Sequence, residues 1–207
     1  MRVLITNISP LRDAALYEEL LRYVPAERQE KIARCGKQED RRRSLGAGLL
    51  LEYGLRSMGC SLLPLVPETE TVHLVRGTHG KPELSGGTGV HFNLSHAGDY
   101  AAAVFDDGAV GIDVERARRV NVNVMQRQFT AAENAYLRSK PDAFLRLWTR
   151  KESVMKATGH GVALSAGAID TLGDTTDACG RGWFLRSSEL DGCPLSAAAE
   201  QPFSLRL

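Results

Sequence analysis

Apolar residues recur at helical spacing through the first part of the chain. Residues 9–24 follow this period after a Ser-Pro start, and Pro25 interrupts it. A second helical pattern runs from residue 27 to about residue 58, charged at its beginning and apolar at its end. Residues 61–89 are rich in Pro and Gly, which predicts loops around one short strand at residues 71–76.

Strict alternation of apolar and polar residues predicts a strand at residues 90–95. The residues expected to point outward from it are His91, Asn93 and Ser95. A second strand is predicted at residues 100–105, and the Asp-Gly pair at residues 107–108 is typical of a hairpin turn. This turn leads into a strand with Asp113 and Glu115, so we expect both acids on a hairpin arm.

The second part of the chain begins with helices and ends with strands. Thr130 and Pro141 mark two helix starts, and the second helix is predicted to run to Gly159, a left-handed stop. Short strands are then predicted at residues 162–170, 183–187 and 203–207. This order of helices and strands predicts an α+β protein.

The turn at residues 106–108 divides the chain into nearly equal parts. We therefore expect an N-terminal subdomain at residues 1–108 and a C-terminal subdomain at residues 109–207. Ligands commonly bind in clefts between domains, so the acidic strand would lie beside such a cleft.

Asp113 and Glu115 carry the strongest chemical signal of the sequence. Side chains alternate along a strand, so the two carboxylates share one face. Unpaired, they would repel each other, and a bound cation would remove that conflict. On a helix, Glu152 and Lys156 also share one face, so the acid can reach a metal while the amine reaches a phosphate. Oxygen ligands of this kind favour magnesium.

Both motifs also occur on ordinary protein surfaces. An acidic pair on an exposed strand is common, and a Glu/Lys pair at helical spacing is usually a solvated ion pair of about 0.3–0.5 kcal/mol. Taken alone, each motif is therefore more typical of a surface than of a site. Their occurrence together in one chain favours a functional site.

The composition is that of an ordinary globular protein. The chain has 207 residues, of which 43% are hydrophobic and 25% are charged. Lysines and arginines number 26 against 25 acids, so the near-neutral charge gives no general reason to expect nucleic acid or a membrane surface. Its four cysteines are scattered and form no Cys-x-x-Cys pair. The sequence predicts neither a signal peptide nor a membrane span, and we expect a cytoplasmic protein.

Basic residues gather between residues 28 and 43. Arg28 and Lys31 are three residues apart and would project together from a helix toward an anion. Acidic residues are interspersed among them, as on a solvated charged helix face. Composition and spacing alone favour that second interpretation.

Several short motifs follow one another along roughly residues 25 to 165. They are Gly-Lys-Pro at 80–82, Phe-Asn-Leu-Ser-His at 92–96, Gly-Ile-Asp-Val-Glu at 111–115, Phe-Thr-Ala-Ala-Glu at 129–133, and Trp148 to Lys156 followed by Gly-His-Gly at 159–161. In these motifs the chain resembles the Sfp-type 4'-phosphopantetheinyl transferases. The resemblance implies an α+β fold of two similar subdomains related by a pseudo-twofold axis. It also implies an active site at their interface, coenzyme A bound there, and usually a monomer.

The resemblance further implies a reaction. The phosphopantetheine arm of coenzyme A would pass to a serine hydroxyl of an apo acyl or peptidyl carrier protein, with release of adenosine 3',5'-bisphosphate. By the matching positions, Asp113, Glu115 and Glu152 would be ligands of Mg²⁺. Lys156 would contact the diphosphate and stabilise the leaving bisphosphate. The carrier would belong to fatty acid, polyketide or nonribosomal peptide synthesis.

The same resemblance implies a donor site in the first subdomain. Arg28 and Lys31 would approach the 3'-phosphate, with Arg43 and Ser44 further along. Arg28 stands where family members often have lysine, which replaces a point charge by a planar fork. Other positions that would contact the nucleotide or its phosphates are Lys81, Pro82, Ser95 and His96.

The serine proton needs a base. Glu152, directly or through a metal-bound water, is the first choice. Glu133 is the second, because its position matches an acid of the family. Glu133 also completes a capping box that starts at Thr130, with Phe129 placed as the hydrophobic staple. The capping role and the catalytic role do not exclude each other.

Two regions and two further functions stay open. Residues 171–207 match no motif of the family, so the carrier-docking surface is not assigned. Residues 120–124 are an apolar candidate for it, although a packed strand or loop explains them more simply. The residues are also compatible with a magnesium-dependent diphosphate hydrolase. A noncatalytic module that binds nucleotides or nucleic acid through the basic stretch is the second alternative.

Overall fold

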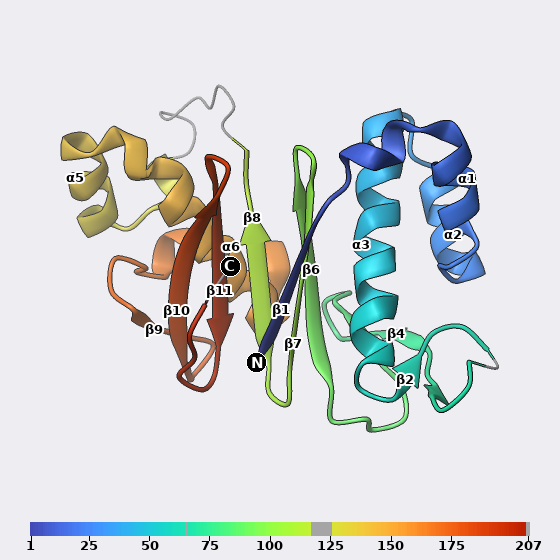
Figure 1. The fold of residues 1–207 in the computed structure, drawn as a ribbon. Coiled ribbons are helices and arrows are strands. Elements are labelled where there is room, and N and C mark those ends of the chain that lie inside the picture. Colours follow the sequence, from blue (N-terminus) through green and yellow to red (C-terminus); the bar gives the residue numbers. More distant parts are fainter. Residues whose placement is uncertain (65, 117–125, 206–207) are drawn as a thin grey trace.

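Two units of helices and strands lie side by side in the computed structural model, which describes residues 1–64, 66–116 and 126–205. The two larger sheets occupy the middle of the molecule, and helices lie toward both ends (Figure 1). One unit takes its sheet from residues before 108 and the other from residues after 109. The predicted α+β class is confirmed.

The first unit is built on a three-stranded antiparallel sheet with the order β1-β7-β6. Its strands are β1 (Arg2–Asn7), β6 (His91–Ala97) and β7 (Tyr100–Asp106). A 3-10 turn at Ser9–Arg12 precedes the helices α1 (Ala14–Leu21), α2 (Ala26–Ala33) and α3 (Gln38–Arg56). Two small strand pairs complete the unit: β2 (Cys60–Ser61) with β3 (Glu70–Thr71), and β4 (Leu74–Arg76) with β5 (Pro82–Leu84).

The second unit has a four-stranded antiparallel sheet with the order β8-β11-β10-β9. Its strands are β8 (Val110–Val114), β9 (Thr175–Ala178), β10 (Arg181–Leu190) and β11 (Cys193–Ala199). Its helices are α5 (Ala131–Ser139) and α6 (Phe144–Thr158). Short 3-10 turns lie at Gln126–Gln128, Pro141–Ala143, Gly161–Ala163 and Ala166–Ala168.

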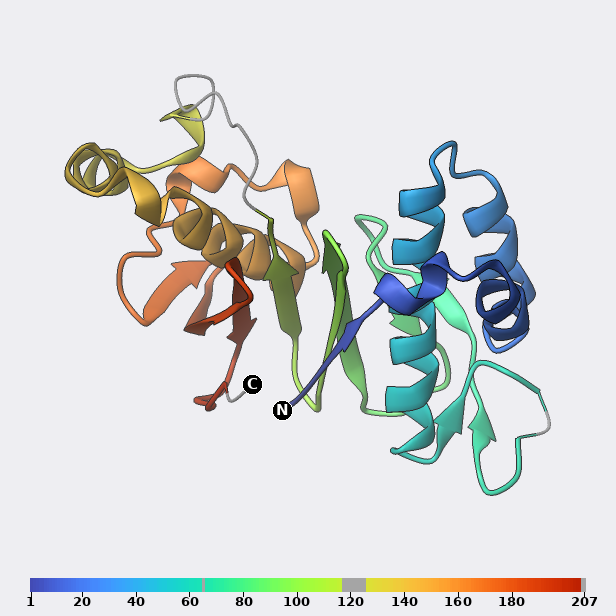
Figure 2. The ribbon, with the colours of Figure 1, turned by 45° about the horizontal axis from the view of Figure 1, so that its top comes forward.

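One long helix packs against each sheet (Figure 2). α3 crosses β6 and β7, and at Gly54 any side chain would overlap the ring of Phe105. α6 crosses β8 and β11 at similarly short range. A Cβ atom at Gly111 would overlap the carbonyl oxygen of Ser153 and would lie 2.5 Å from the amide nitrogen of Ala157. The missing side chain at Gly111 therefore lets α6 lie directly on the strand that carries the acids.

The predicted ends of α5 and α6 are confirmed. Thr130 caps α5 and accepts a hydrogen bond from the amide of Glu133 at 3.1 Å. The 3-10 turn that begins at Pro141 leads into α6, as expected for Pro at a helix start. Gly159 ends α6 with a φ of 75°, a left-handed conformation that glycine adopts without steric cost.

The predicted hairpin between residues 100 and 115 is wrong. β7 and β8 follow each other through the turn at residues 107–108, but they belong to different sheets. β8 pairs with β11 and lies beside β6, whose side chains bind its backbone. The amide of Ile112 donates to Asn93 Oδ1 at 3.0 Å, and the amide of Val114 donates to Ser95 Oγ at 3.2 Å. The outward face of β6 thus forms the junction between the two sheets.

One predicted helix and two predicted strands also differ from the structure. The single helix expected at residues 27–58 is two helices, because the chain breaks between Ala33 and Gln38 around Gly36. The segment expected as a strand at residues 162–170 forms 3-10 turns instead. The first turn begins at Gly161, which has a positive φ like Gly159 before it. No strand is present at residues 203–205, and residues 206–207 lie outside the described part of the chain.

Two strands of the second sheet, β9 and β11, were not predicted. β11 is the central partner of β8 and β10, and its end is Ala197-Ala198-Ala199. Alanine has low strand propensity, so the sequence gives little signal there. Small residues are needed at these positions because α6 packs closely on the strand.

Among the helices that the structure describes, none has the length and apolar character required to cross a membrane.

We expect Gly111→Ala to lower the free energy of unfolding by about 3 kcal/mol, because the new methyl group meets backbone atoms of α6 that cannot rotate away. Urea denaturation followed by circular dichroism measures this change. Gly36→Ala is the matched control, since no atom lies within 4 Å of the position of its Cβ. An equal effect of the two substitutions would contradict the close contact at Gly111.

Candidate active site

A cavity of about 480 Å³ lies between the two units. The first unit lines it with Arg28, Lys31, Ala47, Pro82 and residues 92–96. The second unit lines it with Asp113, Val114, Glu115, Trp148, Glu152 and Lys156. A neighbouring cavity of about 590 Å³ shares Arg28, Lys31 and Pro82 with it. The structure therefore brings the predicted acids and several of the predicted cations to one space.

Asp113 is the most buried acid of the cavity, with 4% of its surface exposed. Its Oδ1 atom accepts hydrogen bonds from Ser95 Oγ at 2.9 Å and from Lys156 Nζ at 2.6 Å. Its Oδ2 atom is buried and has no hydrogen-bond partner among the described residues. One oxygen is thus satisfied by protein groups, and the other is a buried anionic acceptor without a donor.

Glu115 and Glu152 complete the acidic side of the cavity. Glu115 lies two residues after Asp113, and its amide donates to the carbonyl of Pro194 at 3.0 Å. Glu152 comes from α6 and is half-buried. Burial raises the pKa of Glu152, the charges of Asp113 and Glu115 raise it further, and Lys156 opposes the shift. Glu152 therefore holds its proton more tightly than an ordinary glutamate does.

Lys156 connects both units at the cavity wall. Its Nζ atom donates to Asp113 Oδ1, to Ser95 Oγ at 3.1 Å and to the carbonyl of Ile112 at 3.2 Å. About a quarter of its side chain, 26%, remains exposed. The ammonium group is thus held beside the carboxylates and still reaches the cavity.

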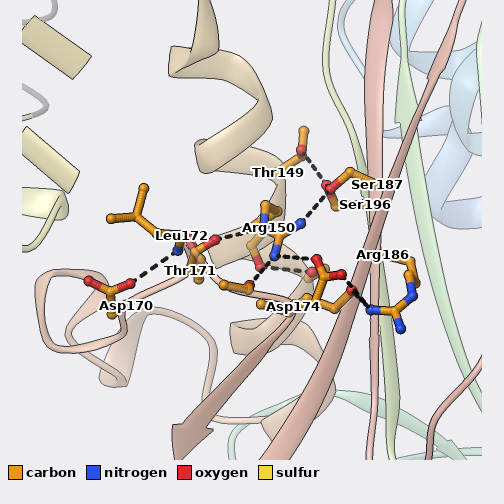
Figure 3. Close-up of polar contacts among 12 residues, drawn as sticks. Thr149, Arg150, Asp170, Thr171, Leu172, Asp174, Arg186, Ser187 and Ser196 are labelled. Carbon is orange, nitrogen blue, oxygen red and sulfur yellow. Dashed lines mark hydrogen bonds and ion pairs between the residues drawn. The ribbon is translucent and has the colours of Figure 1, made fainter. Parts of the chain in front are cut away.

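The residues just before Glu152 fix the rotation of α6 (Figure 3). Thr149 Oγ1 lies 2.8 Å from Ser196 Oγ of β11, which in turn lies 2.9 Å from Ser187 Oγ of β10. Arg150 is 2% exposed, and its Nε donates to the carbonyl of Thr171 at 2.7 Å. It also donates to the Ser187 hydroxyl at 3.1 Å. These buried bonds tie the helix to the sheet and to the loop before β9.

The acidic cluster suits a hard cation, although it is not a ready-made cage. In the described ranges, no three His, Cys, Asp or Glu side chains are arranged as a metal site. Lys156 already donates a hydrogen bond to one oxygen of Asp113. The unpartnered Oδ2 of Asp113 and the raised pKa of Glu152 are both features that a divalent cation would relieve.

Arg28 and Lys31 form the basic side of the cavity. Neither side chain has a hydrogen bond or ion pair with the rest of the described chain, so both remain available to an anion. Burial lowers the pKa of Arg28, and burial together with Arg28 lowers the pKa of Lys31. Both residues thus face one cavity, and their contact with a phosphate stays a prediction.

Arg43 and Ser44 do not line either of the two cavities described above. Arg43 donates to the carbonyl of Gly98 at 3.1 Å and pairs with Asp40 at 3.0 Å. Ser44 is buried, and its hydroxyl has no partner among the described residues. Their expected contact with the donor stays a prediction, and Arg43 already serves to join α3 to the turn after β6.

His96, Pro82 and Ser95 line the cavity as expected, whereas Lys81 does not. Desolvation lowers the pKa of His96, with smaller contributions from cations that include Lys156 and Arg43. Lys81 directs its ammonium group into the second unit, where burial lowers its pKa to about 8. Its expected contact with the nucleotide has no support from this placement.

Glu133 lies outside the cavity in a fully buried ion pair. Its Oε2 atom is 2.6 Å from Lys151 Nζ, and both side chains are 0% exposed. Glu133 also accepts a hydrogen bond from the Thr171 hydroxyl at 2.7 Å and from the amide of Thr130 at 2.8 Å. The predicted capping box is confirmed. This buried carboxylate does not line the cavity, so its placement gives no support to its role as the second candidate base.

Phe129 does not act as the predicted hydrophobic staple. The residue at the matching position of α5 is Asn134, whose side-chain amide donates to the carbonyl of Phe129 at 3.0 Å. The ring of Phe129 packs against α6 instead, 5.3 Å from Phe144 and 6.4 Å from Trp148 between ring centroids. The residue therefore joins the two helices of the second unit.

Several residues at the site were not assigned from the sequence. Phe92 and Asn93 line the cavity, and the alternation that places Ser95 on the outward face of the strand places Asn93 there too. Arg150 supports α6 from a position between the assigned residues, and no local pattern distinguishes it from a surface arginine. Residues 120–124, the candidate carrier contact, lie outside the described residues.

Comparison with protein families gives matches to both units. The family described as the 4'-phosphopantetheinyl transferase superfamily matches residues 109–193. The family described as 4'-phosphopantetheinyl transferase, N-terminal, matches residues 10–106. Together the two matches include every cavity residue named above.

Curated relatives carry the same name. The chain is 30% identical to 4'-phosphopantetheinyl transferase psf-1 of Bacillus pumilus over 79% of its own length and 71% of the relative. It is 33% identical to 4'-phosphopantetheinyl transferase AcpT of Salmonella typhi over 64% of this chain and 69% of that protein. It is 29% identical to 4'-phosphopantetheinyl transferase Sfp of Bacillus subtilis (strain 168) over 71% of this chain. That alignment spans 65% of Sfp, which is less than two thirds.

We expect Lys151→Met to lower the free energy of unfolding by about 3–5 kcal/mol, because it leaves the Glu133 carboxylate buried without its cation. The double variant Glu133→Gln/Lys151→Met should lose less, since no unpaired charge remains. Lys140→Met, at an exposed position of the same unit, is the control. Urea titration measures all three, and a loss below about 1 kcal/mol in Lys151→Met would contradict the structural role of the pair.

We expect the wild type to gain stability over Lys81→Met as the pH rises from about 8 to 10.5, the folded and ordinary pKa values of this lysine. In that window the unfolded state binds more protons than the folded state, so the free energy of unfolding increases with pH. Burial causes the shift and Glu83 opposes it. Urea titrations of both proteins at several pH values measure the difference, and a constant difference would contradict the burial of the ammonium group.

Proposed function

Because the chain belongs to the 4'-phosphopantetheinyl transferase superfamily, we propose that it transfers the phosphopantetheine arm of coenzyme A to a serine hydroxyl of an apo carrier protein. The reaction would depend on Mg²⁺ and would release adenosine 3',5'-bisphosphate. Relatives named 4'-phosphopantetheinyl transferase support the assignment of this chain to that class of enzyme. The observation that carries the proposal is the cavity between the units, with carboxylates on one wall and the cations Arg28 and Lys31 on the other.

The two walls suit two parts of one donor. Coenzyme A carries a phosphate on its ribose and a diphosphate in its middle, so it needs cations at both places. Arg28 and Lys31 have no protein partner within the described part and would bind the ribose phosphate by charge-assisted hydrogen bonds. Lys156 would approach the diphosphate from the opposite unit. The neighbouring cavity, which shares Arg28 and Lys31, gives room for the nucleoside.

Asp113, Glu115 and Glu152 would hold the magnesium ion. The unpartnered Oδ2 of Asp113 supports this assignment, because a buried anionic oxygen needs a donor or a cation. When bound, the ion would neutralise charge on the carboxylates and on the diphosphate of the donor. Burial and the charges of Asp113 and Glu115 raise the pKa of Glu152, and a bound cation would oppose that shift.

Glu152 is the base that we propose for the serine proton. It lines the cavity, is half-buried, and has a raised pKa because of burial and the adjacent Asp113. Its carboxylate would take the proton, directly or through a metal-bound water, when the serine oxygen attacks phosphorus. The phosphorus–oxygen bond to the bisphosphate breaks in that step. Lys156 would stabilise the negative charge that the leaving bisphosphate takes with it.

We further propose that the protein acts as a monomer in the cytoplasm. Cys35, Cys60, Cys179 and Cys193 are all free thiols, which agrees with a reducing compartment. The carrier protein itself is not specified by the cavity. Its serine must reach Glu152 through the opening between the two units.

We expect Glu152→Gln to reduce transfer by about 100-fold or more, because it removes the base and one proposed metal ligand. Intact-mass analysis of apo carrier proteins after incubation with coenzyme A and Mg²⁺ measures the gain of one phosphopantetheine arm. Glu189→Gln, at an exposed glutamate on β10, is the matched control and should transfer at the wild-type rate.

The same assay separates the alternatives. Release of bisphosphate from coenzyme A by the wild type without any carrier would favour a hydrolase. Full activity of Glu152→Gln would remove both roles assigned to this residue. A wild type that modifies none of the acyl and peptidyl carriers, with Mg²⁺ and coenzyme A present, would argue against the transferase.

A further inference from the structure

Lys81 makes the contacts of a residue that joins the two units. It lies in the turn between β4 and β5 of the first unit. Its Nζ atom donates to the carbonyl of Val110 at 3.1 Å and to the carbonyl of Ala157 at 3.2 Å. Both acceptors belong to the second unit. The ammonium group therefore crosses the boundary between the units and binds backbone on the far side.

The two acceptors lie at informative positions. Val110 is the first residue of β8, three residues before Asp113. Ala157 is near the end of α6 and directly follows Lys156. Carbonyl groups in the last turn of a helix lack partners within the helix, and a lysine there is favourable for the helix dipole. The ammonium group of Lys81 thus links β8, which carries Asp113, to α6, which carries Lys156.

A second contact follows the same boundary. The ring of His79, two residues before Lys81, lies 4.6 Å from the ring of His160 between centroids, at 31°. His160 follows the left-handed stop of α6 at Gly159. The side chain of Lys81 passes over this glycine, where an added Cβ would be 3.5 Å from Lys81 Cδ. The turn therefore contacts the end of α6 through both His79 and Lys81.

The turn also forms part of the cavity wall. Pro82, the residue after Lys81, lines both cavities. β5 begins at Pro82 and pairs with β4, whose residues 74–76 line the larger cavity. Lys81 is not among the residues that line either of the two. The turn that is held against the second unit is therefore part of the same cavity wall as Arg28 and Lys31.

From these contacts we propose that Lys81 is a positioning residue that fastens the turn at residues 77–82 to β8 and α6. By this contact it sets the separation between Arg28 and Lys31 on one wall and Asp113 and Glu152 on the other. Its effect on catalysis rests on the proposed function, whereas its effect on the boundary between the units does not.

The test compares Lys81→Met, which keeps the side-chain length and removes the charge, with Lys81→Arg, which keeps charge and donors. Lys37→Met, at an exposed lysine of the first unit, is the control. Hydrogen exchange measured by mass spectrometry reports the contact without any need for activity. We expect exchange at residues 74–84 and 156–161 to become about fivefold faster in Lys81→Met, and to stay unchanged in Lys37→Met.

Ligand binding separates positioning from direct contact. Adenosine 3',5'-bisphosphate has the nucleotide part of the donor and lacks the pantetheine arm. We expect its dissociation constant in Lys81→Met to stay within about twofold of wild type, while kcat of transfer falls about tenfold or more. Lys31→Met should weaken the same ligand by about tenfold, which shows that the assay detects a lost phosphate contact. Lys81→Arg should recover most of kcat.

Two results would overturn the proposal. Unchanged exchange at both segments in Lys81→Met would show that the turn does not depend on the ammonium group. A tenfold weaker binding of the bisphosphate with unchanged exchange would make Lys81 a direct contact of the nucleotide. If Lys81→Met fails to fold, Lys81→Gln takes its place in each comparison. A wild type without transferase activity would refute the proposed function, and the exchange result would still decide the role of Lys81.

Discussion

The burial of the Asp113 carboxylate is the constraint on which the rest of the site depends. An acid with 4% of its surface exposed loses most of its hydration, so its charge has to be compensated by nearby groups. Lys156 does this at 2.6 Å, and it can do so only because α6 lies directly on β8. The absence of a side chain at Gly111 makes that contact possible. The close packing at Gly111 and the compensation of the Asp113 charge therefore depend on each other.

The helix that supplies Glu152 is held by buried polar groups on several sides. Thr149 contacts the hydroxyl of Ser196, Arg150 binds the loop at residues 171–173, and Lys151 pairs with Glu133. Only the next residue turns its carboxylate toward the cavity. Buried polar contacts have strict geometry, so each of them limits rotation of the helix about its axis. In this segment, residues 149–151 therefore hold the helix in place, and Glu152 faces the cavity.

Much of this site could be predicted from local patterns. The period of a strand placed Asp113 and Glu115 on one face, and the period of a helix did the same for Glu152 and Lys156. Thr130 and Gly159 gave correct helix ends because capping is a local interaction. The turn at residues 107–108 misled the pairing of β8, since a turn dipeptide does not determine which strand becomes the neighbour. The partner of Glu133 and the direction of Lys81 depend on contacts between distant segments, which no local pattern contains.

The junction between β6 and β8 has a consequence for how another polypeptide can approach. Side-chain oxygens of Asn93 and Ser95 already accept the amide hydrogens of Ile112 and Val114. These bonds hold β8 beside β6, so this side of β6 is covered and is not open to a foreign strand. A protein partner therefore has to be recognised here by the shape and charge of side chains, and not by backbone pairing.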